Sequence, residues 1–108
     1  IKSSGFRIGP AEIEECLLAH PAVVEAAVIG KPDAARGSIV KALVKLKAGT
    51  VGDDALAEVL RVHVKEALAG YKAPREVVFV DAFPMTSSGK INRRALRDAE
   101  LALQKDAP

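Results

Sequence analysis

The pattern of apolar and polar positions along the chain predicts short strands interspersed with amphipathic helices. Residues 22–29 are rich in β-branched side chains, which favours a strand. Residues 38–47 alternate in character and predict a second strand, and residues 76–80 predict a short buried one. A turn-rich connection over residues 30–37 joins the first two strands. In the second strand we expect these side chains to be buried: Ile39 and Leu43, with Val44 and Leu46 as further candidates.

Three other stretches place apolar residues on one face of a helix. The first covers residues 10–19, because proline is tolerated in a first helical turn and Pro21 blocks any continuation. The second covers residues 53–68, with an aspartate as its cap, and the third covers residues 92–103. The inward stripe of the second helix is expected to hold Leu56, Val59, Leu60, His63, Val64 and Ala67. That of the third is expected to hold Ala95, Leu96, Ala99 and Leu103.

These elements mix without a regular strand–helix–strand rhythm, which predicts an α+β fold: a small mixed sheet flanked by about three helices. Residues 1–8 form a short extended piece broken at Ser-Ser-Gly, which predicts a hairpin or a looped strand. A length of 108 residues fits one domain over 1–108. Because Ile1 is not methionine and a polar motif begins almost at once, we expect a fragment of a longer protein.

Composition argues against several classes of function. The net charge is only +2 with acids and bases interspersed, so charge gives no support for nucleic acid or membrane binding. Aromatic residues are scarce, no apolar run approaches the length of a membrane span, and no signal peptide is visible. Cys16 is the only cysteine, which excludes an internal disulfide. We interpret it as a small core residue in a reducing compartment, the cytoplasm or, in a eukaryote, an organelle matrix.

The stretch from Pro84 to Arg94 carries the clearest candidate chemistry. Thr86, Ser87 and Ser88 supply hydroxyls, and Gly89 permits positive φ or close approach to a ligand. Lys90 adds a compact positive charge near a loop-to-helix junction, where free backbone N–H groups suit an anion. The alternative is a polar turn with a helix cap and a solvated lysine. A Walker A loop is excluded, because proline stands where its first glycine would be.

Two segments together resemble a known family. The chain opens with Ile-Lys-Ser-Ser-Gly-Phe-Arg-Ile-Gly-Pro-Ala-Glu-Ile-Glu over residues 1–14, and Pro-Met-Thr-Ser-Ser-Gly-Lys-Ile-Asn-Arg-Arg follows over residues 84–94. In order and separation these resemble the signature segments of the C-terminal lobe of adenylate-forming enzymes: acyl-CoA synthetases, peptide-synthetase adenylation domains and beetle luciferases. The resemblance implies the same α+β fold, preceded by a short two-stranded piece. It also implies a mobile lobe whose large N-terminal domain and hinge lie upstream of Ile1.

The resemblance implies a reaction and assigns roles within it. A carboxylate and ATP give acyl-AMP and pyrophosphate, and CoA then displaces AMP. Lys90 matches the family's catalytic lysine, with Thr86, Ser88 and Gly89 shaping its loop. Gly5 is implied to line the tunnel for the pantetheine arm of CoA, with Ser4 and Phe6 beside it. Magnesium accompanies ATP, and its ligands are expected in the missing domain rather than in this chain.

Several basic residues carry weaker implications. Arg7 resembles a loop arginine that meets the nucleotide phosphate, since a guanidinium offers paired donors. The alternative for Arg7 is a salt bridge to Glu12 or Glu14. Lys2 stands where relatives have a second functional lysine, although a surface lysine fits equally. Two further sites share the same ambiguity between a CoA 3′-phosphate contact and a solvated surface: Lys65, with Arg61 one helical turn before it, and Lys72.

Other polar residues are assigned structural roles. We interpret His20 and His63 as satisfied structural histidines, and Glu12, Glu14 and Glu15 as complements of a helix dipole. The arginines Arg93, Arg94 and Arg97 are expected to solvate the last helix or to help the lobe dock.

Two alternatives to an acyl-CoA synthetase lobe stay open. One is an adenylation module that loads the thiol of a carrier protein. The segment Gly-Lys-Pro-Asp-Ala-Ala-Arg-Gly over residues 30–37, followed by Val-Lys-Ala, favours the synthetase branch over it. The other is a stand-alone interaction domain without a catalytic role.

Overall fold

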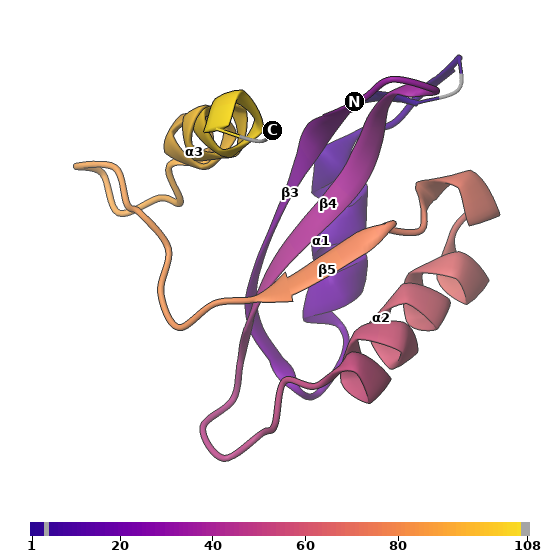
Figure 1. The fold of residues 1–108 in the computed structure, drawn as a ribbon. Coiled ribbons are helices and arrows are strands. Elements are labelled where there is room, and N and C mark those ends of the chain that lie inside the picture. The colour runs from indigo at the N-terminus through magenta and orange to yellow at the C-terminus, as the bar shows by residue number, and fades with distance from the viewer. Residues whose placement is uncertain (4, 107–108) are drawn as a thin grey trace.

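The computed structural model describes residues 1–3 and 5–106 and has an α+β fold (Figure 1). Its centre is a three-stranded sheet in the order β3-β4-β5, where β3 is Val23–Asp33, β4 is Gly37–Leu46 and β5 is Glu76–Phe79. The pair β3–β4 is antiparallel and the pair β4–β5 is parallel. The expected small mixed sheet is therefore confirmed.

The connection expected over residues 30–37 is wrong in extent, because β3 continues to Asp33 and β4 begins at Gly37. A carboxylate oxygen of Asp33 accepts hydrogen bonds from the backbone N–H groups of Ala35 and Arg36, at 3.1 and 2.9 Å. This tight turn lets the hairpin extend further than the turn-forming residues suggested. Pro32 is tolerated within β3 because β3 is an edge strand.

The helices begin and end close to the expected positions. They are α1 (Pro10–Leu18), α2 (Asp54–Ala67) and α3 (Arg93–Asp106). Asp53 caps α2, since its side chain accepts a hydrogen bond from the backbone N–H of Leu56 at 2.9 Å. None of the helices within the described ranges is long and apolar enough to cross a membrane.

The core lies between one face of the sheet and the helices α1 and α2. Its fully buried side chains are Ile13, Leu17, Val28, Val40, Val44, Leu60 and Val64. In β4 the inward positions are the even ones, so Val44 is confirmed and Leu46 packs half-buried against the core, whereas Ile39 and Leu43 are at odd positions and only half-buried. Two strand assignments were thus out of register with the pleat. The strand β5 is likewise an edge strand and not fully buried, with Val78 37% exposed.

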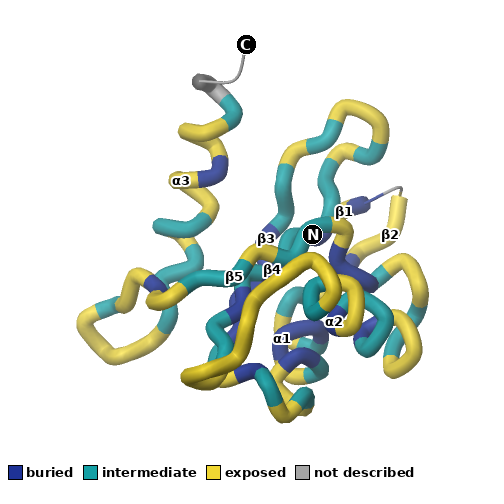
Figure 2. Tube along the Cα trace, turned by 60° about the horizontal axis from the view of Figure 1, so that its bottom comes forward, coloured by how far each residue is buried: buried dark blue, intermediate teal, exposed yellow. Residues whose placement is uncertain are grey.

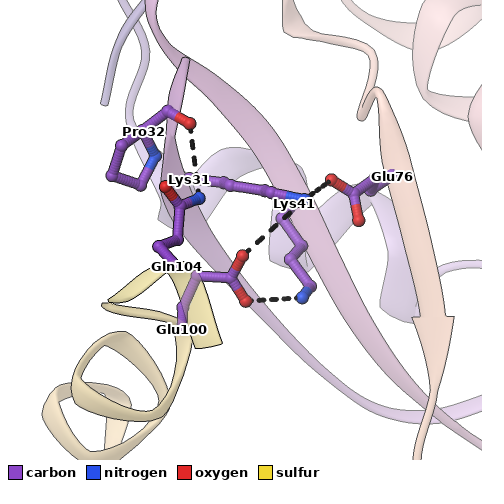
Figure 3. A network of polar contacts seen from close by, with 6 residues as sticks. All are labelled: Lys31, Pro32, Lys41, Glu76, Glu100 and Gln104. Carbon is purple, nitrogen blue, oxygen red and sulfur yellow. Dashed lines mark hydrogen bonds and ion pairs between the residues drawn. The ribbon is translucent and has the colours of Figure 1, made fainter. Parts of the chain in front are cut away.

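The helix α3 lies against the opposite face of the sheet, and its contacts there include a network of charged side chains (Figure 1 and Figure 3). The carboxylate of Glu100 accepts a hydrogen bond from the Lys41 ammonium at 2.7 Å and lies 3.8 Å from that of Lys31. Lys31 also donates to Glu76 at 2.6 Å. Glu100 is buried, whereas Ala99 and Leu103 are exposed, so the expected inward stripe of α3 is wrong at these positions. Glu100 can be buried because Lys31 and Lys41 of the sheet pair with its carboxylate and compensate for its lost hydration.

The stability of the core should depend on α2 through a narrower stripe than expected. Leu60 is fully buried, whereas Val59 is 51% exposed and Ala67 is exposed as well (Figure 2 shows the exposure along the chain). We expect Leu60→Ala to lower the free energy of unfolding by about 2–5 kcal/mol, because it leaves a cavity. The matched change Val59→Ala should alter it by no more than about 0.5 kcal/mol. Urea denaturation of both variants measures the difference, and equal losses would contradict the observed face of α2.

Candidate functional site

The loop that carries Lys90 closes on itself before α3 begins. Met85 and Ile91 form an isolated antiparallel bridge, and the backbone N–H of Thr86 donates to the carbonyl oxygen of Lys90 at 2.7 Å. One step further out, the N–H of Asn92 donates to the carbonyl oxygen of Pro84 at 2.8 Å. The backbone thus forms a small ring that fixes where Lys90 stands. We refer to residues 84–92 as the lysine loop.

Side chains inside the lysine loop complete this ring. The hydroxyl oxygen of Thr86 accepts a hydrogen bond from the backbone N–H of Lys90 at 3.1 Å and lies 3.0 Å from the Ser88 hydroxyl. Gly89 has φ of +82°, a conformation that other residues adopt only with strain. Thr86, Ser88 and Gly89 therefore determine the local conformation of the loop.

Lys90 itself is exposed and available to a ligand. Among the described residues, no carboxylate lies within 4.0 Å of its ammonium group. The N-terminus of α3 is capped from within the chain, because the Asn92 side chain accepts a hydrogen bond from the N–H of Ala95 at 3.0 Å. The side chain of Lys90, rather than a free helix N-terminus, is the group that this region offers to an anion.

The second candidate region is the hairpin formed by β1 (Lys2–Ser3) and β2 (Phe6–Arg7), which confirms the expected two-stranded piece. Gly5 lies at its tip with φ of +85° and no atom within 4 Å of the position that a Cβ would take. The assignment of Ser4 lies outside the described residues. Gly5 is thus exposed to whatever approaches the hairpin.

An aromatic contact that sequence reasoning missed braces this hairpin. The ring of Phe6 stacks on that of Tyr71, with centroids 4.1 Å apart and planes inclined by 13°. Tyr71 belongs to a short 3₁₀ helix, η1 (Gly70–Lys72), which also contributes an ion pair between Lys72 and Glu12. That hydrogen bond from Lys72 to Glu12 raises the pKa of Lys72. Lys72 is therefore engaged within the chain.

The remaining basic candidates are scattered. Arg7 and Lys2 lie opposite each other in the hairpin, and both are exposed. In the described part of the chain, Glu12 pairs with Lys72 and Glu14 with Arg93, so neither forms the alternative salt bridge to Arg7. Lys65 is exposed in the last turn of α2. Its neighbour Arg61 donates to both carboxylate oxygens of Glu58, at 2.8 and 2.5 Å.

The structure does not bring these candidates into one site. The lysine loop lies on one side of the sheet in Figure 1, and the hairpin of β1 and β2 lies at the other end of the molecule. The single chain therefore presents two separate candidate surfaces, one with Lys90 and one with Gly5 and Arg7.

Glu14 has a role that the sequence did not reveal. It is 7% exposed, and one carboxylate oxygen accepts a hydrogen bond from the backbone N–H of Val28 at 2.8 Å. Arg93 donates to both oxygens, from Nε at 2.9 Å and from a terminal nitrogen at 2.5 Å. This hydrogen bonding raises the pKa of Arg93. Glu14 is thus more than a complement of the helix dipole, and Arg93 is more than a solvating residue.

The histidines and the cysteine have structural surroundings, as expected. His63 Nε2 lies 2.8 Å from the carbonyl oxygen of Cys16, and His20 Nδ1 accepts from the N–H of Ala22 at 3.1 Å. The two rings meet edge to face with centroids 5.5 Å apart. Burial raises the pKa of the Cys16 thiol, which disfavours the thiolate. No cluster of three or more His, Cys, Asp or Glu residues suited to a metal occurs within the described ranges.

Comparison with known proteins assigns the chain to a family. The family model described as the AMP-binding enzyme C-terminal domain matches residues 12–90, well over half of the chain. The chain belongs to this family. Within it, the acetyl-coenzyme A synthetase of Bacillus subtilis is 52% identical over 103 residues, which are 95% of this chain and 18% of that protein. The 4-hydroxybutyrate–CoA ligase 1 of Metallosphaera sedula is 51% identical over 100 residues, 93% of this chain and 18% of that ligase.

Solved structures of the AMP-binding enzyme C-terminal domain family have the same fold. A Brucella canis acyl-CoA synthetase matches with a TM-score of 0.93 and 52% identity, over 95% of this chain and 19% of that one. The identification of the adenylate-forming superfamily from the two signature segments is therefore confirmed. The chain spans only 18% of the length of the first curated relatives that it matches.

Proposed function

We propose that this chain is the mobile C-terminal lobe of a longer ATP-dependent acyl-CoA synthetase, attached to a large N-terminal domain. The observation that carries the proposal is an exposed lysine, Lys90, held on a closed loop in a chain whose relatives at about half identity are named CoA synthetases and ligases. In this proposal the isolated lobe is inactive, because the acid pocket and most of the nucleotide site belong to the other domain.

The first half-reaction joins two anions, which explains the need for a lysine. A carboxylate oxygen attacks the α-phosphorus of ATP, a P–O bond to the acid forms, and the bond to pyrophosphate breaks. Negative charge accumulates around the phosphorus in the transition state. An ammonium group at that point stabilises the transition state more than the ground state. We assign this role to Lys90, with Mg²⁺ carried by ATP and held by phosphates and the N-terminal domain.

The second half-reaction has a different requirement, a narrow path for a thiol. The CoA sulfur attacks the acyl carbon and AMP leaves with the bonding electron pair. We assign this path to the β1–β2 hairpin, with Gly5 at its tip and Ser4 and Phe6 next to it in the sequence. We assign Arg7 and Lys2 to the nucleotide, and Lys65 to the 3′-phosphate of CoA. Since the two surfaces lie apart, one lobe serves both steps only by rotating between them.

The acid that is activated should be selected outside this lobe. The chain is 52% and 51% identical to two proteins named for different acids, acetate and 4-hydroxybutyrate. Similarity in this lobe therefore does not follow the identity of the acid. We place the enzyme in the cytoplasm or an organelle matrix, and one set of human relatives is named as mitochondrial.

An assay of the full-length protein with two acceptors tests this function. We expect acid-dependent exchange of pyrophosphate into ATP, followed by thioester formation on free CoA. Thioester formation only on a phosphopantetheinylated carrier protein would support the adenylation module instead. An absence of exchange across short-, medium-, long-chain and aromatic acids would contradict the proposal and favour the interaction domain. That result gains weight if the upstream sequence lacks a phosphate-binding loop rich in serine, threonine and glycine.

A further inference from the structure

On its α1 side the lysine loop borders a pocket, through Ile91. Figure 1 shows the loop and α3 standing apart from the layer of α1 and α2. A cavity of about 350 Å³ lies between α1, the start of β3 and Ile91, bordered by the partly exposed side chains of Leu18 and Val24. Apolar packing therefore leaves a gap on this side of the loop. Glu14 and Arg93 border the same cavity and pair with each other.

The carboxylate of Glu14 is itself rigidly held. Its side chain is 9% exposed, so an unpaired charge there would lose most of its hydration. Three hydrogen bonds compensate for that loss: one from the Val28 backbone in β3 and two from Arg93. The first of these bonds holds Glu14 against the sheet, and the other two hold Arg93 against Glu14.

Arg93 is the first residue of α3 and follows Lys90 by three positions. The paired donors of its guanidinium allow one orientation on the carboxylate, since both N–H···O contacts must form together. Asn92, between the loop and the helix, closes the ring to Pro84 and caps α3. A restraint on Arg93 is therefore a restraint on the end of the lysine loop.

We propose that Glu14 and Arg93 are positioning residues for Lys90, a rigid strut from the sheet through α1 that sets where the ammonium group stands during adenylation. This inference rests on the proposed function and deepens it. The strut acts on one half-reaction only, because the β1–β2 hairpin has its own supports in the Phe6–Tyr71 stack and the Lys72–Glu12 pair. Positioning matters here because a displacement of about 1 Å can reduce a rate about 100-fold.

The test measures both half-reactions in the full-length enzyme carrying Glu14→Gln, Arg93→Gln or both. Pyrophosphate exchange reports adenylation, and conversion of preformed acyl-adenylate with CoA reports thioester formation. We expect each single variant to lower the kcat of adenylation about 10- to 100-fold and to change thioester formation by less than about twofold. The double variant should be no slower than the slower single variant, because either change removes the same strut. Arg93→Lys should recover part of the rate, since it keeps a charged donor.

Glu100→Gln is the matched control. Glu100 is also a buried glutamate, 5% exposed, but it lies about two turns beyond Arg93 in α3 and pairs with Lys41 and Lys31 of the sheet. We expect this variant to be less stable to urea while keeping the wild-type ratio of the two half-reaction rates. The proposal is overturned if Glu14→Gln and Arg93→Gln slow both half-reactions equally or leave adenylation unchanged, or if Glu100→Gln gives the same imbalance.

The double variant protects the test against a simple folding failure of either single variant, because it leaves no unpaired charge at the buried Glu14 position. The same assays separate this inference from the proposed function. If Lys90→Ala leaves adenylation intact, the proposed function fails. If Lys90→Ala abolishes adenylation while the Arg93 variant retains it, only the strut is refuted.

Discussion

Replacement of Lys90 by alanine in the full-length enzyme should lower the rate of acyl-adenylate formation at least about 100-fold. The loss follows from the charge distribution of the step: the incoming carboxylate and the phosphate oxygens repel each other, and Lys90 is the cation that the loop presents without an internal partner among the described residues. Thioester formation from preformed acyl-adenylate should be largely spared. Pyrophosphate exchange and a direct thioester assay measure the two rates separately.

Lys47→Ala is the control for the Lys90 variant. Lys47 is likewise an exposed lysine, but it follows β4 and lies far from the lysine loop in the chain. Its removal should leave both half-reactions within about twofold of wild type, as expected for a surface change away from the site. Loss of thioester formation alone in Lys90→Ala would contradict the assignment of this lysine to the first step.

Much of the fold could be predicted because its signals are local. Pro10 and Pro21 bracket α1, Asp53 caps α2, and Gly5 marks the tip of the first hairpin. Each of these residues acts through its own backbone or that of its immediate neighbours. The lysine loop was predictable for the same reason, since Thr86, Ser88 and Gly89 close it through contacts within a few residues.

The rest of the candidate site could not be predicted, because it depends on partners distant in sequence. Glu14 and Arg93 are separated by 79 positions, and Lys41 and Glu100 by 59. In the sequence, Glu14 is a helix-dipole glutamate and Glu100 a polar position on an amphipathic helix. Only the tertiary arrangement shows that each carboxylate is buried against a cation. The stacking of Phe6 on Tyr71 escaped prediction for the same reason.

The complementary result is expected from Gly5→Leu: thioester formation at least about 100-fold slower, with pyrophosphate exchange near wild type. In the lobe alone a side chain at Gly5 meets no atom within 4 Å, so the bulk of leucine is directed into space outside the lobe. If that space becomes the pantetheine path in the thioester-forming orientation, leucine obstructs the thiol. The same pair of assays measures both effects.

Backbone strain must be separated from obstruction, because Gly5 has φ of +85°. A leucine there costs on the order of 1–2 kcal/mol before any contact with CoA. Gly49 supplies the matched control, since it also has φ of +85° and no atom within 4 Å of a Cβ position. Gly49→Leu should lose similar stability to urea while keeping both half-reactions. Gly5→Ala adds the strain with little bulk, so it should slow thioester formation much less than leucine does.

Comparison of these three variants decides what Gly5 does. If Gly5→Leu slowed both half-reactions to the same extent, or if Gly49→Leu matched its effect on thioester formation, strain would be sufficient and the tunnel assignment would fail. A loss of thioester formation alone that is larger for Gly5→Leu than for Gly5→Ala would instead show that the side chain obstructs a narrow passage. Together with the opposite selectivity at Lys90, that result would show that the two surfaces act in turn, since neither substitution would affect the step assigned to the other.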